Sequence, residues 1–372
     1  MKYHSTMTAK NDQNGIAYPV DMCFDKCALP PQVTAVVVGY RSIRFLRQCF
    51  TALMNQQDVS CEIVFIDNNS HDGSVDLVRN EFPAIRVLER LSNDGYAVAN
   101  NQGIAEARRC GAKYVFILNP DVILEKDCLK LLLREASEKT GLFQPLLLLP
   151  DGRIQSAGNR VHYLGFGCSG LRNCSEDGNT AFRVNYASGA ALLIDIAIIE
   201  QIGDIEESFF LYHEDLEFGL RAQLAGFYSW CVPAARALHD HSFDRNPNKI
   251  FYLERNRLAF LFAYASPKTL LRLAPLLICV EIAVIIFACL LGPKGIRAKL
   301  TSFVSLIGMR RDIKKLRKRV MRFHPDPYAF LFPTFYGEID FPPDAGFFPG
   351  FANVCSRNLF RLARYFVESA GV

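Results

Sequence analysis

The stretch VTAVVVGY, residues 33–40, is a continuous apolar run rich in valine. Such a run is typical of a strand that is covered on both faces, as strands of parallel sheets are. Apolar side chains at helical spacing follow over 44–57, and further apolar runs come at 62–67 (EIVFID) and 85–90 (IRVLER). Because strands and helices alternate, we predict an α/β fold with a mostly parallel central sheet.

The alternation continues along the chain and then becomes less regular. We expect a strand at 114–118 (YVFIL) and another at 191–194 (ALLI), with a looser, Gly-rich pattern between 139 and 190. Helices are predicted at 75–82, 96–109, 126–138 and 214–225.

Composition narrows the classes of protein that need to be considered. The chain has 372 residues, enough for about two folded units, and a net charge of +4, which is too small to indicate a nucleic-acid-binding protein. The 12 cysteines show no zinc-ligand spacing. We therefore expect mostly free thiols in a reducing compartment and no nucleic-acid partner.

Polar residues follow three of the predicted strands. One strand ends at Asp67, the next runs into Asn93, and YVFIL runs into Asn119-Pro120-Asp121. Asx, Gly and Pro are common turn residues, so each turn alone is ambiguous. Ligands of such sheets bind beyond the carboxyl ends of the strands, and three polar turns at one edge therefore predict a site.

The residue types at this edge suggest nucleotide chemistry without the usual motifs. Neither a GxGxxG fingerprint nor a GxxxxGK[ST] loop is present, which argues against a Rossmann-type dinucleotide site and against a P-loop ATPase. Asp67 could accept hydrogen bonds from a base or ribose. Asp121 suits either a divalent cation that carries a diphosphate or a simple turn. Asp215 suits either a catalytic base or a helix N-cap, and His239 either a metal ligand or a structural residue.

A series of motifs carries a family resemblance, in the correct order over roughly 33–265. The series is VVVGYRS, FIDNNSHDGS, NDGYAVANNQGI, FILNPDV, ASGAALLI, FFLYHEDLEFGLRAQLAG and PAARALHDHS. It resembles the family 2 glycosyltransferases, in particular their rhamnosyltransferase-like branch. The resemblance implies a GT-A fold, in which an α/β half that binds a nucleotide-sugar is joined to an acceptor half.

The resemblance also implies roles for individual residues. Asp215 would be the catalytic base. Glu214 and Arg221 would contact the acceptor or support the residues that do. Asp121 and His239 would hold Mg²⁺ or Mn²⁺. Binding of the nucleotide-sugar would fall to Gly39, Tyr40, Arg41, Asp67, Asn93, Asn101 and Arg255.

Two departures from the family pattern affect the metal site. The first position of the DxD-type motif is Asn119, which leaves Asp121 as its one carboxylate. The doublet HDHS offers both His239 and His241, and spacing from Pro233 favours His239.

The most apolar stretch lies further along, from Leu273 to Leu291, and its length is close to the ~20 residues needed to span a bilayer. Pro275 and Glu281 count against a plain span. The region 294–322 that follows carries eleven Lys or Arg and one acid. We therefore expect a re-entrant or in-plane element at an anionic inner leaflet; the alternative is a helix buried against the catalytic domain.

Four segments are thus expected. A flexible leader covers 1–32 and the GT-A domain 33–265. The apolar segment and the basic membrane-surface region cover 266–322. A C-terminal extension with a short amphipathic helix covers 323–372.

The expected activity is inverting transfer of a sugar, with L-rhamnose as one candidate, from a TDP- or UDP-linked donor. The acceptor would be a hydroxyl of a glycan or lipid-linked molecule, in cell-surface glycan synthesis at the cytoplasmic face of a membrane. One alternative is an inactive membrane scaffold, which has no use for intact Asp67, Asp121 and Asp215. The other is a nucleotidyltransferase, whose triphosphate loop is missing from VVVGYRSIRF.

Overall fold

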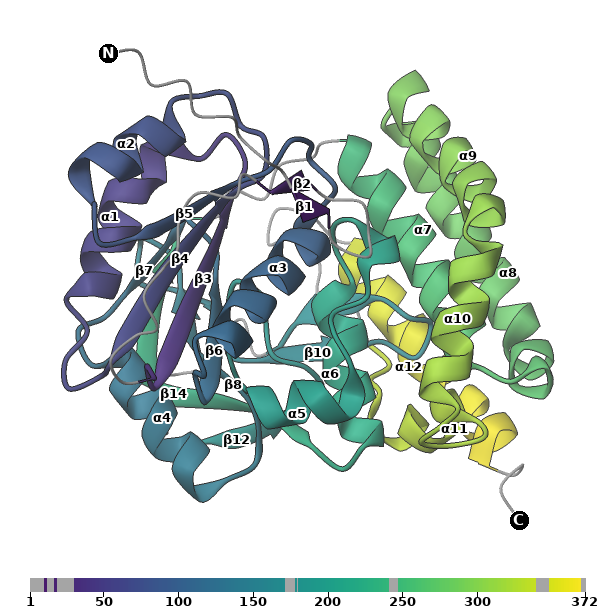
Figure 1. The fold of residues 1–372 in the computed structure, drawn as a ribbon. Helices are drawn as coiled ribbons and strands as arrows, with labels where there is room; N and C mark the ends of the chain where they lie inside the picture. Colours follow the sequence, from purple (N-terminus) through teal and green to yellow (C-terminus); the bar gives the residue numbers. More distant parts are fainter. Residues whose placement is uncertain are drawn as a thin grey trace, which may run out of the picture.

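The computed structural model describes residues 10–11, 17–18, 30–170, 178, 180–240, 247–338 and 348–368. Most of the predicted leader lies outside these residues; its described part is an antiparallel pair, β1 (Lys10–Asn11) with β2 (Ala17–Tyr18). Figure 1 shows a central sheet flanked by helices in one half of the molecule and a layer of helices, α7 to α12, in the other.

The strands predicted first form the parallel part of the sheet. They are β3 (Val33–Gly39), β4 (Cys61–Asp67), β5 (Arg86–Glu89) and β6 (Tyr114–Leu118). The order β6-β3-β4-β5 is parallel throughout, and Gly39, Asp67 and Glu89 lie side by side where β3, β4 and β5 end. The strand ends therefore meet at one edge, as the sequence predicts.

The sheet continues beyond β6 with one reversed strand. β8 (Gly141–Leu148) and β14 (Tyr228–His239) are parallel to each other, whereas β13 (Ala191–Asp195) lies between β6 and β8 and is antiparallel to both. Short antiparallel strands complete it: β7 (Val122–Leu124), β9 (Ile154–Ser156) and β12 (Phe182–Val184), with β10 (Asn159–Val161) and β11 (Gly167–Ser169) forming a separate pair. The predicted α/β fold with a mostly parallel sheet is confirmed, with β13 as the main exception.

The alternation of side chains along β3 explains its continuous apolar sequence. Val33, Ala35 and Val37 pack into one core, with side chains of α1 (Ile43–Met54), α2 (Ser74–Glu81) and α4 (Cys128–Glu138). Val36 and Val38 pack into a second core on the other face, with side chains of α3 (Tyr96–Arg109), α5 (Ile196–Ile202) and α6 (Glu214–Leu224). Both faces of the strand are buried, which favours apolar side chains; the one polar residue of β3, Thr34, is buried as well.

The helical half has its own core. It consists of α7 (Pro247–Tyr264), α8 (Pro267–Leu290), α9 (Pro293–Gly308), α10 (Arg310–Val320), α11 (Pro327–Leu331) and α12 (Phe348–Glu368), with the 3₁₀ turns η1 (Glu207–Phe209) and η2 (Phe332–Thr334). Fully buried Tyr264 and Tyr328 share this core with Leu216 of α6, which joins the two halves. The C-terminal helix α12, expected to be short, has 21 residues.

The predicted apolar segment forms α8, which reverses at Gly292 into α9. By length and composition, α8 could cross a membrane. Only 17% of its most apolar 18-residue window is buried inside the protein. The alternative of a helix buried against the catalytic domain is therefore wrong.

Candidate active site

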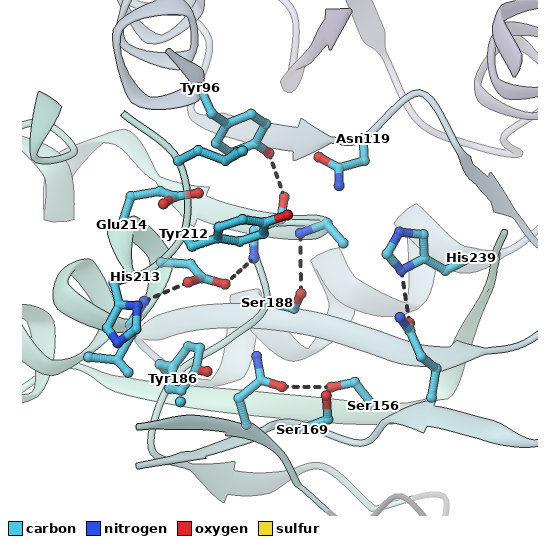
Figure 2. Close-up of a pocket in the computed structure, with 18 of the residues that line it drawn as sticks. Tyr96, Asn119, Ser156, Ser169, Tyr186, Ser188, Tyr212, His213, Glu214 and His239 are labelled. Atoms are coloured by element: carbon cyan, nitrogen blue, oxygen red, sulfur yellow. Dashed lines mark hydrogen bonds between the residues drawn. The ribbon is translucent and has the colours of Figure 1, made fainter. Parts of the chain in front are cut away.

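A cavity of about 310 Å³ lies where the sheet edge meets α6. A cavity of this size fits a small ligand or part of a larger one. Figure 2 shows Glu214 and His213 on one side of it, His239 on the opposite side, and Tyr96 and Asn119 between them. Its lining therefore joins the end of β6, the beginning of α6 and the end of β14.

Asp215 lines this cavity from the first turn of α6. The N-cap of the helix is His213, so the alternative that Asp215 is an N-cap is wrong. Its Oδ2 accepts a hydrogen bond from the Gly189 N–H at 3.1 Å, and its Oδ1 accepts one from the Leu216 N–H at 2.8 Å. Burial raises the pKa of Asp215, and these donors oppose the rise. The carboxylate is thus oriented by the backbone, as a base requires.

Glu214 presents a second carboxyl to the cavity. It is 7% exposed, and its Oε2 makes no hydrogen bond with any described residue. Burial, followed by the charge of Asp215, raises its pKa from 4.5 to about 8. A carboxyl in this state can carry a proton near neutral pH and donate it in a hydrogen bond.

The raised pKa of Glu214 predicts pH-dependent stability. A carboxyl with a higher pKa in the folded state stabilises the fold at low pH, and this contribution is lost as the pH rises from about 4.5 through about 8. Relative to Glu214→Gln, the free energy of unfolding of the wild type should fall across this range by at least about 1 kcal/mol. Urea unfolding at about pH 5.5 and pH 8.5 measures this difference.

The exposed Glu138 of α4 supplies the control. Glu138→Gln should follow the wild type at both pH values, because this carboxyl is 65% exposed. A difference between wild type and Glu214→Gln that does not change with pH would contradict the prediction.

The loop before α6 is strained and firmly held. Phe210, Tyr212 and His213 have φ angles of 63°, 66° and 72°, which L-residues rarely adopt. Such strain persists only where the surroundings impose it, and it is common at functional sites. The His213 ring lies 3.1 Å from the Gly165 carbonyl oxygen, which helps to hold the loop.

Two side chains of α7 hold the loop before α6 by donating hydrogen bonds to its carbonyl oxygens. The Asn256 amide donates to the carbonyl oxygens of Leu211 and Tyr212 at 2.9 and 2.7 Å. Arg255 donates to the Phe209 carbonyl oxygen at 2.6 Å. Arg255, predicted to bind the nucleotide-sugar, is thus placed as an anchor of the loop and does not line the cavity.

Asp121 and His239 come together because β7 pairs antiparallel with β14, with Val122 opposite His239. Asp121 Oδ1 lies 3.4 Å from His239 Nε2. The Nδ1 of His239 lies 2.8 Å from Gln155 Oε1, an acceptor, so the proton belongs on Nδ1 and the lone pair of Nε2 faces Asp121.

This pair fits a divalent cation. Asp121 Oδ1 is buried and makes no hydrogen bond within the described part of the chain, and one carboxylate oxygen beside one imidazole nitrogen suits Mn²⁺ or Mg²⁺. No group of three or more His, Cys, Asp or Glu side chains converges among the described residues. The remaining ligands would therefore be phosphate oxygens and water. His241 lies outside the described residues.

Four of the seven residues predicted to bind the nucleotide-sugar, Gly39, Tyr40, Arg41 and Asp67, lie where β3 and β4 end, beyond the cavity. Gly39 pairs with Asp67, and the Arg41 N–H donates to Ser70 Oγ at 3.0 Å; Tyr40, between them in the chain, is exposed. Asp67 Oδ2 accepts from the Ser70 N–H at 2.9 Å, whereas its buried Oδ1 has no hydrogen-bond partner in the described residues. This oxygen is available to a hydroxyl or an N–H of a ligand.

Three other predicted residues serve packing in the structure. Asn93 Oδ1 accepts from Asn68 Nδ2 and from the Gly95 N–H, which shapes the turn after β5. The Asn101 amide exchanges hydrogen bonds with the Ile205 backbone, just before η1, and also donates to Glu207 Oε1 in η1. Arg221 is fully buried and paired with Glu217 at 2.9 Å. None of the three lines the cavity.

Gly95 explains why this turn meets the loop before α6. Its φ is +102°, and a Cβ there would lie 2.5 Å from the Phe210 carbonyl oxygen. Only glycine permits this close approach, and the next N–H, that of Tyr96, donates to the same oxygen at 2.7 Å.

Sequence reasoning missed several residues of the site. The Tyr96 hydroxyl donates to the Gly189 carbonyl oxygen at 2.8 Å, and Gln155 orients His239. Gly189 lies within the motif ASGAALLI, which was a usable signal. Gln155 stands in no motif, so only the structure identifies it.

Comparison with known proteins shows similarity to glycosyltransferases. Residues 34–174 match the model of glycosyl transferase family 2. The N-acetylglucosaminyl-diphospho-decaprenol L-rhamnosyltransferase of Mycobacterium tuberculosis (strain H37Rv) is 28% identical over 240 residues, covering 57% of this chain and 78% of the relative. The rhamnosyltransferase WbbL of Escherichia coli (strain K12) is 24% identical over 202 residues, covering 50% of this chain and 75% of the relative.

A solved structure shares the fold. The crystal structure of GalNAc-T7 with UDP, GalNAc and Mn²⁺ has a TM-score of 0.53 at 13% sequence identity and covers 67% of this chain. This chain spans about half, 51%, of the length of that structure. Residues 34–174 therefore match glycosyl transferase family 2, the chain is similar in sequence to two rhamnosyltransferases, and the solved structure supports the GT-A fold.

Proposed function

We propose that the chain is an inverting, metal-dependent transferase that moves a sugar from a nucleoside-diphosphate donor to a hydroxyl of a glycan or lipid-linked acceptor. The observation that carries the proposal is that one cavity is lined by Asp215 and by His239, beside which Asp121 lies. TDP- or UDP-linked L-rhamnose is the donor to test first, because two of the relatives are named rhamnosyltransferases.

In this proposal Asp215 takes the proton of the acceptor hydroxyl as its oxygen attacks the anomeric carbon. The bond from that carbon to the diphosphate oxygen breaks on the opposite face, so the configuration inverts and no covalent enzyme intermediate forms. The backbone N–H groups of Gly189 and Leu216 hold the carboxylate in place for this step. Protonated Glu214 would donate a hydrogen bond to a sugar hydroxyl in the same cavity.

The donor would be held by residues from both sides of the sheet edge. Asp67 would accept hydrogen bonds from the ribose or base through its unpartnered Oδ1. Asp121 and His239 would hold the cation, which supplies positive charge to neutralise the departing diphosphate. Gln155 keeps His239 in the tautomer that this role requires.

We place this reaction at the cytoplasmic face of a membrane, in cell-surface glycan synthesis. Two observations support a membrane location, without choosing its face: α8 is long and apolar enough for a membrane, and the name of the mycobacterial relative specifies a decaprenol-linked acceptor.

Nucleotide binding tests the proposal directly. Thermal unfolding of the detergent-purified protein would be measured with TDP, UDP, GDP and CMP, each with and without Mn²⁺. A ligand at ~100 times its Kd adds about 2.7 kcal/mol, which gives a visible shift. We expect one nucleoside diphosphate to stabilise the protein only when metal is present.

An Asp121→Ala variant should lose the metal-dependent part of this shift. Asp76→Ala, at an exposed position in the first turn of α2, should keep it. If no nucleotide shifts the wild type, the proposal fails and an inactive scaffold with this fold is the better account. If the shift survives in Asp121→Ala, the metal assignment is wrong.

A further inference from the structure

The outer side of the α8–α9 hairpin is an exposed apolar surface, which we call the hairpin face. It is formed by Ile278, Ile282 and Ile285 of α8 and by Leu300, Val304 and Ile307 of α9, which are 44–70% exposed. Their spacings of three and four place them on one side of each helix. Exposed apolar patches of this kind mark sites that bind a partner or a membrane.

Figure 1 shows where this surface lies. Helices α8 and α9 are the outermost elements on the side of the molecule away from α1 and α2. The hairpin face therefore does not border the sheet, and within the described residues its side chains remain open to solvent.

Positive charge lies at both ends of the hairpin face. Exposed Lys268 and Arg272 stand at the beginning of α8, and exposed Lys294 and Arg297 stand at the beginning of α9. The basic helix α10 begins shortly after α9 ends. One side of α10 has a hollow of about 370 Å³, lined by Lys314, Arg317, Lys318, Met321 and Arg322. An apolar stripe bordered by cations is complementary to an anionic lipid surface.

An ion network holds the hairpin against α7. Glu281, in the middle of α8, contacts Arg257 of α7, and its other oxygen lies 2.7 Å from Lys299 Nζ of α9. Glu254 of α7 pairs with the same two cations, at 2.8 Å from Arg257 and 2.5 Å from Lys299. Arg257 is 0% exposed and Lys299 is 2% exposed.

This network argues against a helix that crosses the membrane. To span a bilayer, α8 would have to leave α7 and α9, which would strand Glu281 in lipid and leave the two buried cations with one carboxylate. The charges at the hairpin tip, Lys294 and Arg297, would also have to pass through the hydrocarbon core. Lying flat avoids both costs, because Glu281 faces the protein while the isoleucines face outward.

We propose that the hairpin face binds the surface of an anionic lipid bilayer, with α8 and α9 parallel to the membrane plane and the chain held on one leaflet. Only the choice of the cytoplasmic leaflet rests on the proposed function. A lipid-linked acceptor would then meet the enzyme at the surface to which it is already bound.

Vesicle flotation tests the binding surface. The full chain would be floated with vesicles of phosphatidylcholine, alone or with about 30 mol% phosphatidylglycerol, at low and high salt. We expect binding to the anionic vesicles that weakens with salt. An Ile282→Glu/Leu300→Glu variant should bind at least about tenfold more weakly. Met54→Glu, a matched change at a 53% exposed position that ends α1, should bind like the wild type.

Extraction of cell membranes with alkaline carbonate distinguishes lying flat from spanning. Release of the protein supports the in-plane arrangement, whereas retention in the membrane overturns it. The docking surface is also overturned if the wild type fails to bind anionic vesicles, or if the double variant binds as well as the wild type. Equal binding to neutral and anionic vesicles removes the role of the cations.

Nucleotide-dependent thermal shifts on the same samples keep the two proposals separate. The double variant should retain the shift, which shows that it is folded. A wild type that binds vesicles but no nucleotide contradicts the proposed function and leaves the docking surface standing; the reverse result contradicts docking alone.

Discussion

An Asp215→Asn variant is expected to lose about 10²–10⁴-fold or more in kcat while it still binds the nucleoside diphosphate. The amide has nearly the shape of the carboxylate, and its oxygen can still accept one of the two backbone hydrogen bonds that hold Asp215. It cannot take a proton from the acceptor hydroxyl. Transfer of radiolabelled sugar measures the loss, and the nucleotide-dependent thermal shift reports binding.

Asp76→Asn is the matched control, because Asp76 also stands in the first turn of a helix but is exposed and lies outside the cavity. It should leave turnover and binding unchanged. Full turnover in Asp215→Asn would exclude Asp215 as the base. Loss of nucleotide binding together with turnover would indicate a damaged site and not a missing proton acceptor.

The second large effect concerns Arg257, whose guanidinium joins Glu254 and Glu281 in the buried network between α7 and α8. Burial alone would raise the pKa of Glu254, yet Arg257 and Lys299 lower it to about 2. An Arg257→Met variant leaves the buried Glu254 and the partly buried Glu281 with a single cation. We expect it to reduce the free energy of unfolding by about 3–5 kcal/mol, measured by urea unfolding.

Two further variants show whether this loss comes from charge. Arg134→Met, at a 60% exposed position on α4, should change stability by less than about 0.5 kcal/mol. Adding Glu281→Leu to Arg257→Met leaves Glu254 with Lys299 as a balanced pair, so a large part of the stability should return. A double variant as unstable as the sum of the single variants would assign the loss to packing instead.

The parallel part of the fold could be predicted because β3 is buried on both faces and therefore carries a run of valines. The direction of β13 could not. The apolar sequence ALLI is compatible with a parallel or an antiparallel strand. Its antiparallel pairing with β6 depends on where the chain between 139 and 190 returns to the sheet. That segment shows little periodicity, so local sequence carries no information about the return.

Some residues of the candidate site could likewise be predicted from the sequence, and others could not. Asp67, Asp121 and Asp215 stand in motifs or after strands, so both chemistry and resemblance point to them. Asn256 and Gln155 act by bonding to a backbone or by orienting a ring, and such tasks leave no pattern in sequence.

Glu281 shows the same limit for the apolar segment that forms α8. An acid within an apolar run is visible in the sequence, but its two cations lie on separate helices. Hydropathy therefore identifies the length of α8 and not the way it faces.

The antiparallel strand β13 determines where the chain can be truncated. It lies outside the region 34–174 that matches the family model, yet it fills the gap between β6 and β8, two strands inside that region. A fragment cut at the family boundary would lose both β13 and β14, which leaves one edge of β6 and both sides of β8 without these partners, and other chains can add to such edges. The region that matches the family model is therefore not a module that can be excised or transplanted, and a fragment that keeps the partners of β8 must extend to His239.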